Sequence, residues 1–175
     1  MGARNYPALQ KAISRHALAL FHKGIGAKVD RMSDAEEYII RDGRGDDLAF
    51  IYSTWTKSYR CDSDVAKGCR DSTFYSEYSK VIDQILSHPD TEIKVAALKS
   101  DPLVIYGYFV SQGEVGHYTF VKESFWNLGI ASKLWNSCGH KISEYSHRTH
   151  TIRPILDRKN VIYNPFILFK KKDSL

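Results

Sequence analysis

Alternating aromatic and β-branched residues mark two strands in the middle of the chain, at 105–110 and 117–122. The intervening Ser111–Gly113 supplies a turn, so the two strands are expected to form a β-hairpin. Gly129 follows the second strand, at a point where a residue without a side chain lets the backbone approach a ligand closely. The pattern then changes to helical spacing, with one face formed by Ala131, Leu134, Trp135, Cys138 and Ile142.

The same patterns divide the rest of the chain into helices and strands. The segment 60–71 is polar and is expected to be a loop. This alternation of helices and strands predicts an α/β protein of the α+β type. The other expected elements are helices at 6–23, 48–59, 72–87 and 152–160, and strands at 38–41, 93–99, 145–150 and 161–169.

Composition and charge narrow the class of protein. The chain has 175 residues, of which 43% are hydrophobic, enough for one domain with a buried core. Its net charge of +5 is concentrated at both ends, around a mildly acidic centre. Basic ends can bind nucleic acid or an acidic partner, but they are more often solvated surface. Nucleic acid is not expected as a partner, because the sequence lacks the interleaved aromatic and basic residues of a base-stacking surface.

Targeting signals and metal sites are not expected either. The N-terminal residues do not resemble a signal peptide, and no apolar run approaches the ~20 residues of a membrane span. The three cysteines, Cys61, Cys69 and Cys138, lack the spacing of a metal site. Reduced thiols in a cytoplasmic protein that does not contact a membrane are the simplest interpretation.

The segment from Val121 to Leu134 resembles the acetyl-CoA loop of the GNAT superfamily of N-acetyltransferases. That loop has valine, four residues, arginine or glutamine, two residues, glycine, one residue, and then glycine or alanine. Val121, Gly129 and Ala131 match this spacing, whereas Trp126 occupies the arginine or glutamine position. The alternative interpretation is a hairpin packed on an amphipathic helix, with Gly129 in a tight turn.

The resemblance implies that acetyl-CoA is the cofactor and that backbone N–H groups of this loop bind its pyrophosphate. A helix start suits a phosphate, so the missing arginine or glutamine does not by itself exclude binding. Acetyl transfer needs no metal, and none is expected. The implied cofactor-binding residues are Phe120, Val121, Lys122, Asn127, Leu128, Gly129, Ile130, Ala131 and Ser132.

The order of elements from residue 38 onward also resembles that of a GNAT domain. The resemblance implies a mixed, mostly antiparallel central sheet with helices on both faces, preceded by an extra N-terminal helix. It also implies that acetyl-CoA lies in a wedge where the fourth strand splays from the fifth. The chain would then consist of an N-terminal helical extension, residues 1–34, and a GNAT-like acetyltransferase domain, residues 35–175.

Proton transfer requires titratable groups near the thioester. His117 lies on the expected fourth strand, where some family members carry a histidine that serves as base or water relay, and imidazole titrates near neutral pH. Alternate residues of a strand share a face, so His117, Thr119 and Val121 are expected to point into one cleft unless a β-bulge turns His117 away. The other candidates are Glu114 as the base, and Tyr163 or Tyr145 as the acid that protonates the departing thiolate.

The sequence thus predicts an enzyme that transfers an acetyl group directly from acetyl-CoA to an amine by general base catalysis. The amine is either a small molecule or a protein lysine or N-terminus, and a homodimer is left open. Trp55, Ser58, Tyr59 and the run Tyr163–Pro165 resemble bacteriophage-encoded members of the family. Two alternatives remain: a non-catalytic binding protein with this fold, and a nucleic-acid-binding module that uses the basic ends.

Overall fold

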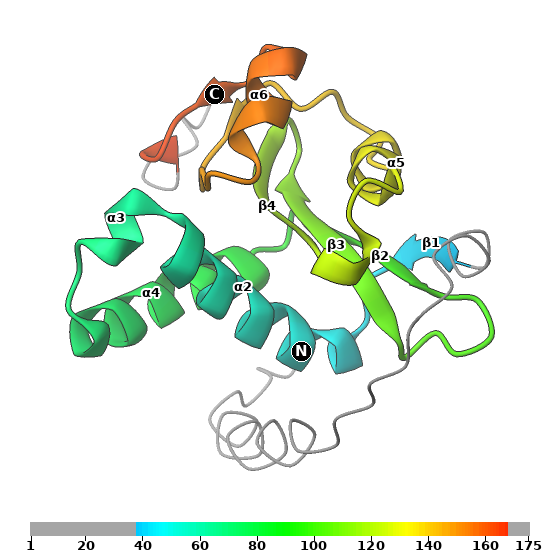
Figure 1. Ribbon diagram of the computed structural model, residues 1–175, viewed down its shortest axis with the longest axis horizontal. Helices are drawn as coiled ribbons and strands as arrows, with labels where there is room; N and C mark the ends of the chain where they lie inside the picture. Colours follow the sequence, from blue (N-terminus) through cyan, green and yellow to red (C-terminus); the bar gives the residue numbers. More distant parts are fainter. Residues whose placement is uncertain (1–37, 168–175) are drawn as a thin grey trace. The chain divides into compact units, whose positions relative to one another are not determined.

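The computed structural model describes residues 38–167, which are built around one six-stranded sheet (Figure 1). The strands β1 to β4 pair antiparallel, whereas β4 with β5 and β5 with β6 pair in parallel. The helix expected at 6–23 and the extension 1–34 lie outside the described residues. The strands neighbour one another in chain order: β1 Tyr38–Asp42, β2 Thr91–Leu98, β3 Ile105–Gln112, β4 Val115–Val121, β5 Glu144–Tyr145 and β6 Ile162–Tyr163.

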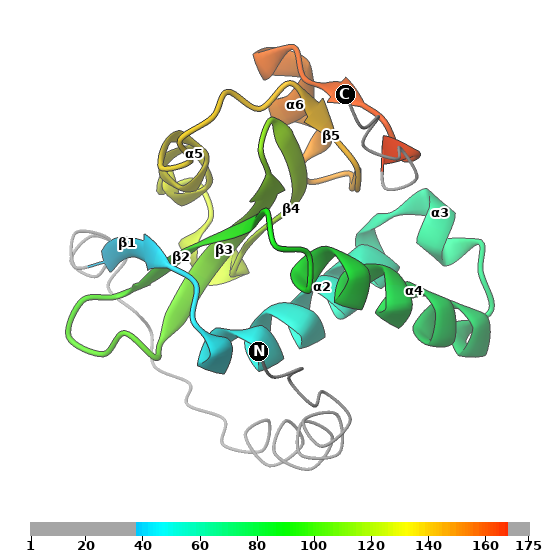
Figure 2. The same cartoon turned by 180° about the vertical axis from the view of Figure 1, so that it is seen from behind.

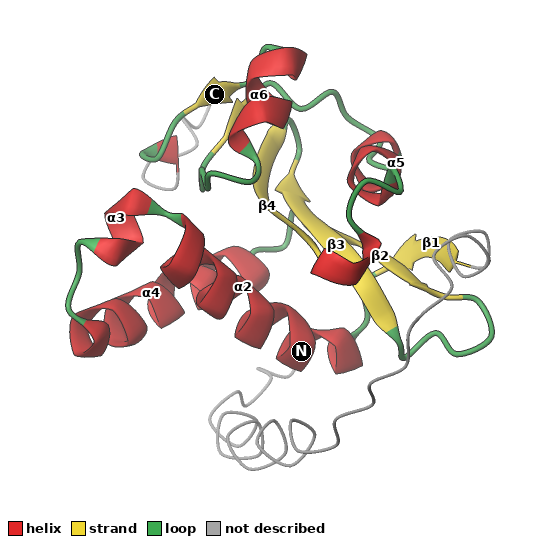
Figure 3. Cartoon of the chain, viewed as in Figure 1, coloured by secondary structure: helices red, strands yellow, loops and turns green. Residues whose placement is uncertain are grey.

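Helices cover both faces of the sheet. On one face, α2 and α4 lie side by side, as Figures 1 and 2 show, and α5 and α6 pack on the other. Tyr108, Phe109 and Val110 of β3 alternate accordingly: Tyr108 and Val110 pack with α2 and α4, whereas Phe109 packs with α5 and α6. Tyr106 also packs on the α5 side, because a register shift between Ala96 and Ala97 leaves it without a partner on β2 and breaks the alternation there. The helices are α2 Leu48–Asp62, α3 Asp64–Lys67, α4 Asp71–Leu86, α5 Ile130–Asn136 and α6 Arg153–Lys159, with short 3-10 turns η2 Gly45–Asp47 and η3 Glu123–Phe125 (Figure 3).

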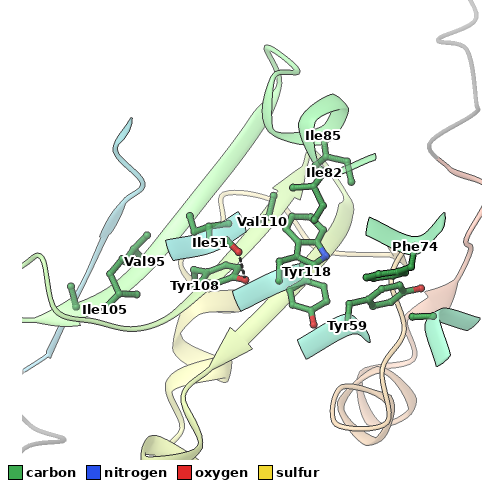
Figure 4. Close-up of a cluster of buried hydrophobic side chains, with 13 residues drawn as sticks. Ile51, Tyr59, Phe74, Ile82, Ile85, Val95, Ile105, Tyr108, Val110 and Tyr118 are labelled. Carbon is green, nitrogen blue, oxygen red and sulfur yellow. Dashed lines mark hydrogen bonds between the residues drawn. The ribbon is translucent and has the colours of Figure 1, made fainter. Parts of the chain in front are cut away.

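The core on the α2 side is rich in aromatic rings (Figure 4). Trp55 of α2 is fully buried and stacks on Tyr118 of β4 with ring centroids 4.7 Å apart. Its indole N–H donates to the Tyr78 hydroxyl at 2.8 Å, so the polar atom of the ring is satisfied in the core. This packing fixes the position of α2 over β4, and residues of both elements line the cavity described below.

An ion pair fixes the start of α2 against β1. The Arg41 guanidinium donates to both carboxylate oxygens of Asp47, at 2.7 and 2.8 Å, and the Arg44 backbone N–H donates to the same carboxylate at 2.7 Å. Asp47 is buried, and removing one partner of a buried pair typically costs ~3–5 kcal/mol. The direction in which α2 leaves the sheet is therefore set at its first turn.

The expected fold class is confirmed: the sheet is mixed and mostly antiparallel, and helices cover both faces. Several element boundaries differ from those expected. α2 continues to Asp62 instead of ending at 59, and β6 ends at Tyr163, whereas the last strand was expected to continue to 169. Residues 64–67 form α3 where a loop was expected, and α5 ends at Asn136, six residues before Ile142. β5 contains two residues instead of the six expected at 145–150. The early end of β5 has the largest consequence, because it opens the sheet beside β4.

Candidate active site

The strands β4 and β5 separate soon after they meet. They share only two residue pairs, at Val115 and Gly116, and the last backbone hydrogen bond between the two segments joins the Ser146 N–H to the Gly116 carbonyl at 3.0 Å. The ring of Tyr145 fills the fork, since a side chain at Gly116 would approach it to 2.6 Å. Within 38–167, no backbone hydrogen bond joins a later residue of this segment to β4, so the edge of β4 beyond this point is open.

A cavity of about 730 Å³ lies along this open edge. One end is formed by the loop that joins β4 to α5, and the other by the last turn of α2. The segment 149–158, which includes most of α6, lines it as well.

The loop end of the cavity exposes backbone rather than side chains. Gly129 has a φ of 75°, and a Cβ added to it would meet no atom within 4 Å. The first backbone hydrogen bond of α5 runs from the Lys133 N–H to the Gly129 carbonyl at 3.0 Å. The N–H groups of the three residues between them therefore have no partner within the helix. Gly129 and these three residues all line the cavity, so their N–H groups lie where an anion could accept hydrogen bonds.

Most of the cofactor-binding residues predicted from the sequence meet at the cavity. Lys122 and Leu128 do not line it, because Lys122 places its ammonium 5.2 Å from the centre of the Phe50 ring and Leu128 packs against the core. The roles of all nine remain predictions. Those that line the cavity are Phe120, Val121, Asn127, Gly129, Ile130, Ala131 and Ser132.

Trp126 forms a hydrogen bond across the loop and carries no charge. Its indole N–H donates to the Val121 carbonyl at 2.7 Å, and 47% of the residue is exposed. An indole has a single N–H and no positive charge, so it cannot replace the arginine that the family places here. Any phosphate in this loop must therefore be held by backbone N–H groups or by a cation from another element.

Replacing Trp126 with arginine should leave the affinity for acetyl-CoA unchanged or raise it by up to about tenfold. The loss of one hydrogen bond costs ~1 kcal/mol, whereas a charge-assisted bond to a phosphate contributes ~1.5–3 kcal/mol. Calorimetric titration measures the affinity, and Trp126→Phe is the control that removes the hydrogen bond but keeps a ring. A large loss of affinity in a folded Trp126→Arg protein would show that the indole itself contacts the cofactor.

The opposite end of the cavity, called the α2 end below, carries a pair of hydroxyl groups. The Ser58 hydroxyl donates to the Thr54 carbonyl, so the Tyr118 O–H donates to Ser58 Oγ at 2.8 Å. Burial raises the pKa of Tyr118, against the opposing effect of the hydrogen bond with Ser58, so Tyr118 stays protonated at neutral pH. The residues of the α2 end are Ser58, Cys61, Asp62, Tyr118, Thr149 and Thr151.

Asp62 provides a fixed carboxylate at the α2 end. Its Oδ2 accepts a hydrogen bond from the Thr151 N–H at 2.9 Å, and its backbone carbonyl accepts one from the His150 N–H at 3.0 Å. Burial acts to raise the pKa of Asp62, but hydrogen bonds from Thr151 and Thr149 outweigh it and hold the pKa below its usual value. Asp62 is thus ionised at neutral pH, and it fastens α2 to the segment that follows β5.

A β-bulge in β4 places His117 differently from the expectation. Tyr118 pairs with Val110 and Gly116 pairs with Ser111, so His117 is an extra residue with no partner on β3. A bulge of this kind turns two consecutive side chains to the same face of a strand, here His117 and Tyr118.

The neighbours of His117 show which face that is. Its ring centroid lies 6.4 Å from that of His147, which in turn packs edge-on against Trp55 of α2 at 5.5 Å. Thr119 points to the other face, where it accepts a hydrogen bond from the indole of Trp135 in α5 at 2.8 Å. The expectation that His117 shares a face with Thr119 and Val121 is therefore wrong, and the bulge is the reason.

His117 is buried in a chain of hydrogen bonds outside the cavity lining. Its Nδ1 lies 2.8 Å from Ser146 Oγ, which lies 2.7 Å from Nδ1 of His147. Ser146 has one hydroxyl proton, so it donates to one ring and accepts from the other, and the two histidines hold complementary tautomers. No described residue bonds to Nε2 of His117. Its role as a base stays a prediction, without a contact to the cavity.

The buried histidines should make the protein sensitive to acid. Burial, with a smaller repulsion from His88, lowers the pKa of His117 to about 4, and burial with repulsion from His117 lowers that of His147 to about 3. The unfolded chain takes up these protons near pH 6.5, so the unfolded state binds more protons as the pH falls. Stability is then full above about pH 6.5 and decreases towards about pH 4.

We expect the free energy of unfolding to fall by about 1.4 kcal/mol per pH unit for each buried histidine between about pH 6.5 and 5, where carboxylates stay ionised. Chemical denaturation at a series of pH values measures this slope. His147→Gln should remove one histidine's share of the slope. A flat profile across this window would contradict the neutral, buried state of both rings.

The other predicted catalytic residues lie away from the cavity. Glu114 is exposed in the turn between β3 and β4, where its carboxylate accepts from the Ser143 hydroxyl at 3.1 Å. Tyr163 lies on β6 with the Arg148 guanidinium 4.5 Å from its ring centre. Tyr145 is buried in the fork and donates to the Thr119 hydroxyl at 3.0 Å. Among the described residues that line the cavity, none of the three is found, so their roles remain predictions.

Sequence reasoning did not single out Asp62, Tyr118 or Arg158. Asp62 was assigned to a polar loop, although the spacing of Trp55, Ser58 and Asp62 continues the helical face of α2 by one turn. Tyr118 lines the cavity next to the bulge in β4, and a single sequence does not show where such a bulge occurs. Arg158 of α6 is the only lysine or arginine among the described residues that line the cavity, and nothing in its local pattern indicates this.

Metal-ligand clusters and membrane-spanning helices are both absent from the described region. Between residues 38 and 167, the structure brings together no group of three or more histidine, cysteine, aspartate or glutamate residues that could hold a metal ion. In the same region no helix is both long enough and apolar enough to span a membrane.

Comparison with known proteins gives similarity to solved structures only. No protein-family model matches the chain, and no curated protein matches it in sequence. A Pyrococcus furiosus protein described as a candidate acetyl transferase is 15% identical, with a TM-score of 0.45 over 79% of this chain and 96% of that one. AAC(6')-Iy, in complex with the bisubstrate analogue CoA-S-monomethyl-acetylneamine, is 13% identical with a TM-score of 0.39 over 79% and 94%. Glucosamine-6-phosphate N-acetyltransferase from Arabidopsis thaliana is 12% identical with a TM-score of 0.37 over 79% and 95%.

Proposed function

We propose that this chain is a GNAT-type N-acetyltransferase that transfers an acetyl group directly from acetyl-CoA to an amine. The observation that carries the proposal is the cavity of about 730 Å³ along the open edge of β4. Its volume is in the range of small-molecule sites, ~300–1,000 Å³. Backbone N–H groups suited to an anion lie at one end, and a tyrosine hydroxyl with a carboxylate lies at the other.

The loop end suits the pyrophosphate of the cofactor. The N–H groups that follow Gly129 can donate to phosphate oxygens, and Arg158 on α6 supplies the positive charge that Trp126 does not. Glu123 also lines the cavity and would repel phosphate, so the phosphates are expected nearer to Gly129 than to Glu123. The pantetheine arm would then follow the open edge of β4 towards Tyr118.

The α2 end supports the chemistry of acyl transfer. A neutral amine attacks the thioester carbonyl, and negative charge develops on the carbonyl oxygen. The carbonyl re-forms as the C–S bond breaks, and the proton that the attacking nitrogen loses passes through water to the departing sulfur, so the products are the amide and the CoA thiol. Tyr118 is protonated and buried, and its single O–H proton, which Ser58 Oγ accepts in this structure, would turn to the carbonyl oxygen as charge develops there, without leaving Tyr118. The ammonium proton of the acceptor leaves to water, because neither His117 nor Glu114 lines the cavity in the described structure.

The acceptor is an amine, either a small molecule or a protein lysine or N-terminus. Two of the similar structures are named for, or contain, amino sugars or aminoglycoside derivatives. The polar groups of the α2 end are hydroxyl groups, one thiol and one carboxylate. Because the carboxylate is the only charged group among them, a basic small molecule is the first acceptor class to test.

Thermal unfolding with acetyl-CoA, with CoA and with a nucleic-acid control tests the proposal. A ligand at a hundredfold excess over its dissociation constant stabilises the folded state by about 2.7 kcal/mol. We expect this shift with acetyl-CoA and CoA but not with nucleic acid, together with release of free thiol when an amine is added. Stabilisation without thiol release over a broad amine panel would favour the non-catalytic binding protein, and a shift with nucleic acid alone would overturn the proposal.

A further inference from the structure

The carboxylate of Asp62 lines the cavity, and an electrostatic attraction to His150 is the smallest of the effects that lower its pKa. In the described part of the chain, no lysine or arginine forms an ion pair with Asp62. The nearby His150 directs its Nε2 to Asp64 instead, at 3.0 Å. The hydrogen bond from Thr151 and the contacts with Thr149 hold the carboxylate in place. A fixed, ionised group in a cavity wall is arranged to bind a positive charge.

The reacting nitrogen of the acceptor is not a suitable partner for this carboxylate. An amine must lose its proton, and with it the positive charge, before it attacks the thioester. A carboxylate beside an ammonium stabilises the charged form, so it would lower the fraction of amine that can react. Asp62 is also a weak base, since its pKa is held below the usual value by Thr151 and Thr149 against the effect of burial. The charge that Asp62 binds must therefore lie elsewhere in the acceptor.

We infer that Asp62 binds a second positive charge of the acceptor, so that the acceptor is a diamine or polyamine-like cation rather than a monoamine. The inference rests on the proposed function and names the acceptor class of the same site. Ser58 and Thr149 surround the bound cation with hydroxyl oxygens that can accept its remaining hydrogen bonds. The reacting nitrogen then lies nearer to Tyr118, where the thioester carbonyl is expected.

Cys61 offers a direct probe of charge at this end of the cavity. It is exposed, lines the cavity beside Asp62, and is one of three cysteines in the chain. In a Cys69→Ser, Cys138→Ser background it is the only thiol left. The rates at which it reacts with a cationic and an anionic methanethiosulfonate reagent then report the local potential, whether or not acetyl-CoA is bound.

We expect Asp62→Asn to lower the ratio of cationic to anionic reaction rates at Cys61 about tenfold, which corresponds to about 1.4 kcal/mol. Asp64→Asn is the matched control, because Asp64 is an exposed carboxylate two residues away that does not line the cavity. A ratio that is unchanged in Asp62→Asn, or that falls equally in Asp64→Asn, overturns the inference.

Acetyl transfer to 1,3-, 1,4- and 1,5-diaminoalkanes and to butylamine provides the second readout. Asp62→Asn should lower kcat/KM for the preferred diamine by about 10- to 100-fold, the value of a charge-assisted hydrogen bond, and for butylamine by less than about threefold. Equal losses would place Asp62 at the reacting nitrogen and overturn the inference, as would the absence of transfer to any diamine. Calorimetry with acetyl-CoA separates the two proposals: a wild-type protein that does not bind acetyl-CoA overturns the proposed function itself.

Discussion

Replacing Gly129 with glutamate should abolish acetyl-CoA binding, with a loss of affinity of more than about 100-fold, while the sheet stays folded. The added side chain would stand in the open space where the phosphates are proposed to lie, and its carboxylate would repel them. The φ of 75° adds strain of about 1–2 kcal/mol for a residue with a side chain, which is small beside the stability of a typical domain. Calorimetric titration with acetyl-CoA measures the loss, and circular dichroism monitors the fold.

The chain offers a matched control for this substitution. Gly113, in the turn between β3 and β4, also has a positive φ, 54°, and an added Cβ there would meet no atom within 4 Å. Gly113→Glu introduces the same strain and the same charge away from the cavity, so it should bind acetyl-CoA normally. Gly129→Asn tests an uncharged side chain with little added strain, because asparagine tolerates this backbone conformation. Normal binding by Gly129→Glu would show that the phosphates do not lie at this loop.

The loop and the strand before it were predictable because their signals are local. The change from period two to helical spacing places Gly129 between a strand and a helix, and the structure has β4 and α5 at those positions. A positive φ at that junction also follows from the residue type, since glycine adopts it without a steric cost. Trp126 was expected not to act as an arginine, and its hydrogen bond to Val121 gives that expectation a structural reason.

The open edge of β4 was harder to predict, because it depends on where two distant segments stop pairing. Of residues 146–150, only Thr149 is β-branched. After the Ser146 N–H has bonded to Gly116 the backbone leaves β4, and the side chains of Ser146 and His147 are buried in the core. Their hydrogen bonds to His117 form only because a bulge in β4 brings that ring to the same side. One sequence shows neither the bulge nor the partner, so the face of His117 was assigned incorrectly.

The α2 end of the cavity also depends on contacts between residues far apart in the sequence, which one sequence does not show. Asp62 and Thr151 are separated by 89 positions in the chain, yet their hydrogen bond defines one wall of the cavity. Ser58 and Tyr118 are 60 positions apart and meet at 2.8 Å. Such pairs are set by how α2 packs across β4, which depends on the whole aromatic core around Trp55 and not on any local pattern.

Replacing Tyr118 with phenylalanine should lower kcat by about 100- to 1,000-fold, the typical effect of removing one preorganised donor to a developing oxyanion. The change removes a single hydroxyl and keeps the ring that stacks on Trp55, so the fold and the affinity for acetyl-CoA should be preserved. Ser58 Oγ is the acceptor that competes for the Tyr118 proton, so Ser58→Ala should leave kcat unchanged or raise it. Thiol release under saturating acetyl-CoA measures kcat, and calorimetry measures the affinity.

Tyr108 provides the control that separates catalysis from packing. It is buried on the neighbouring strand β3, its hydroxyl donates to the Ile51 carbonyl at 3.1 Å, and it does not line the cavity. Tyr108→Phe removes a buried hydroxyl of the same kind, at a similar cost in stability, without touching the thioester. If both variants lose activity equally, Tyr118 supports the fold and not the reaction. If only Tyr118→Phe is impaired, and the pH dependence of kcat keeps its shape, the hydroxyl acts as a hydrogen-bond donor that stays protonated, as burial of Tyr118 and the raised pKa require.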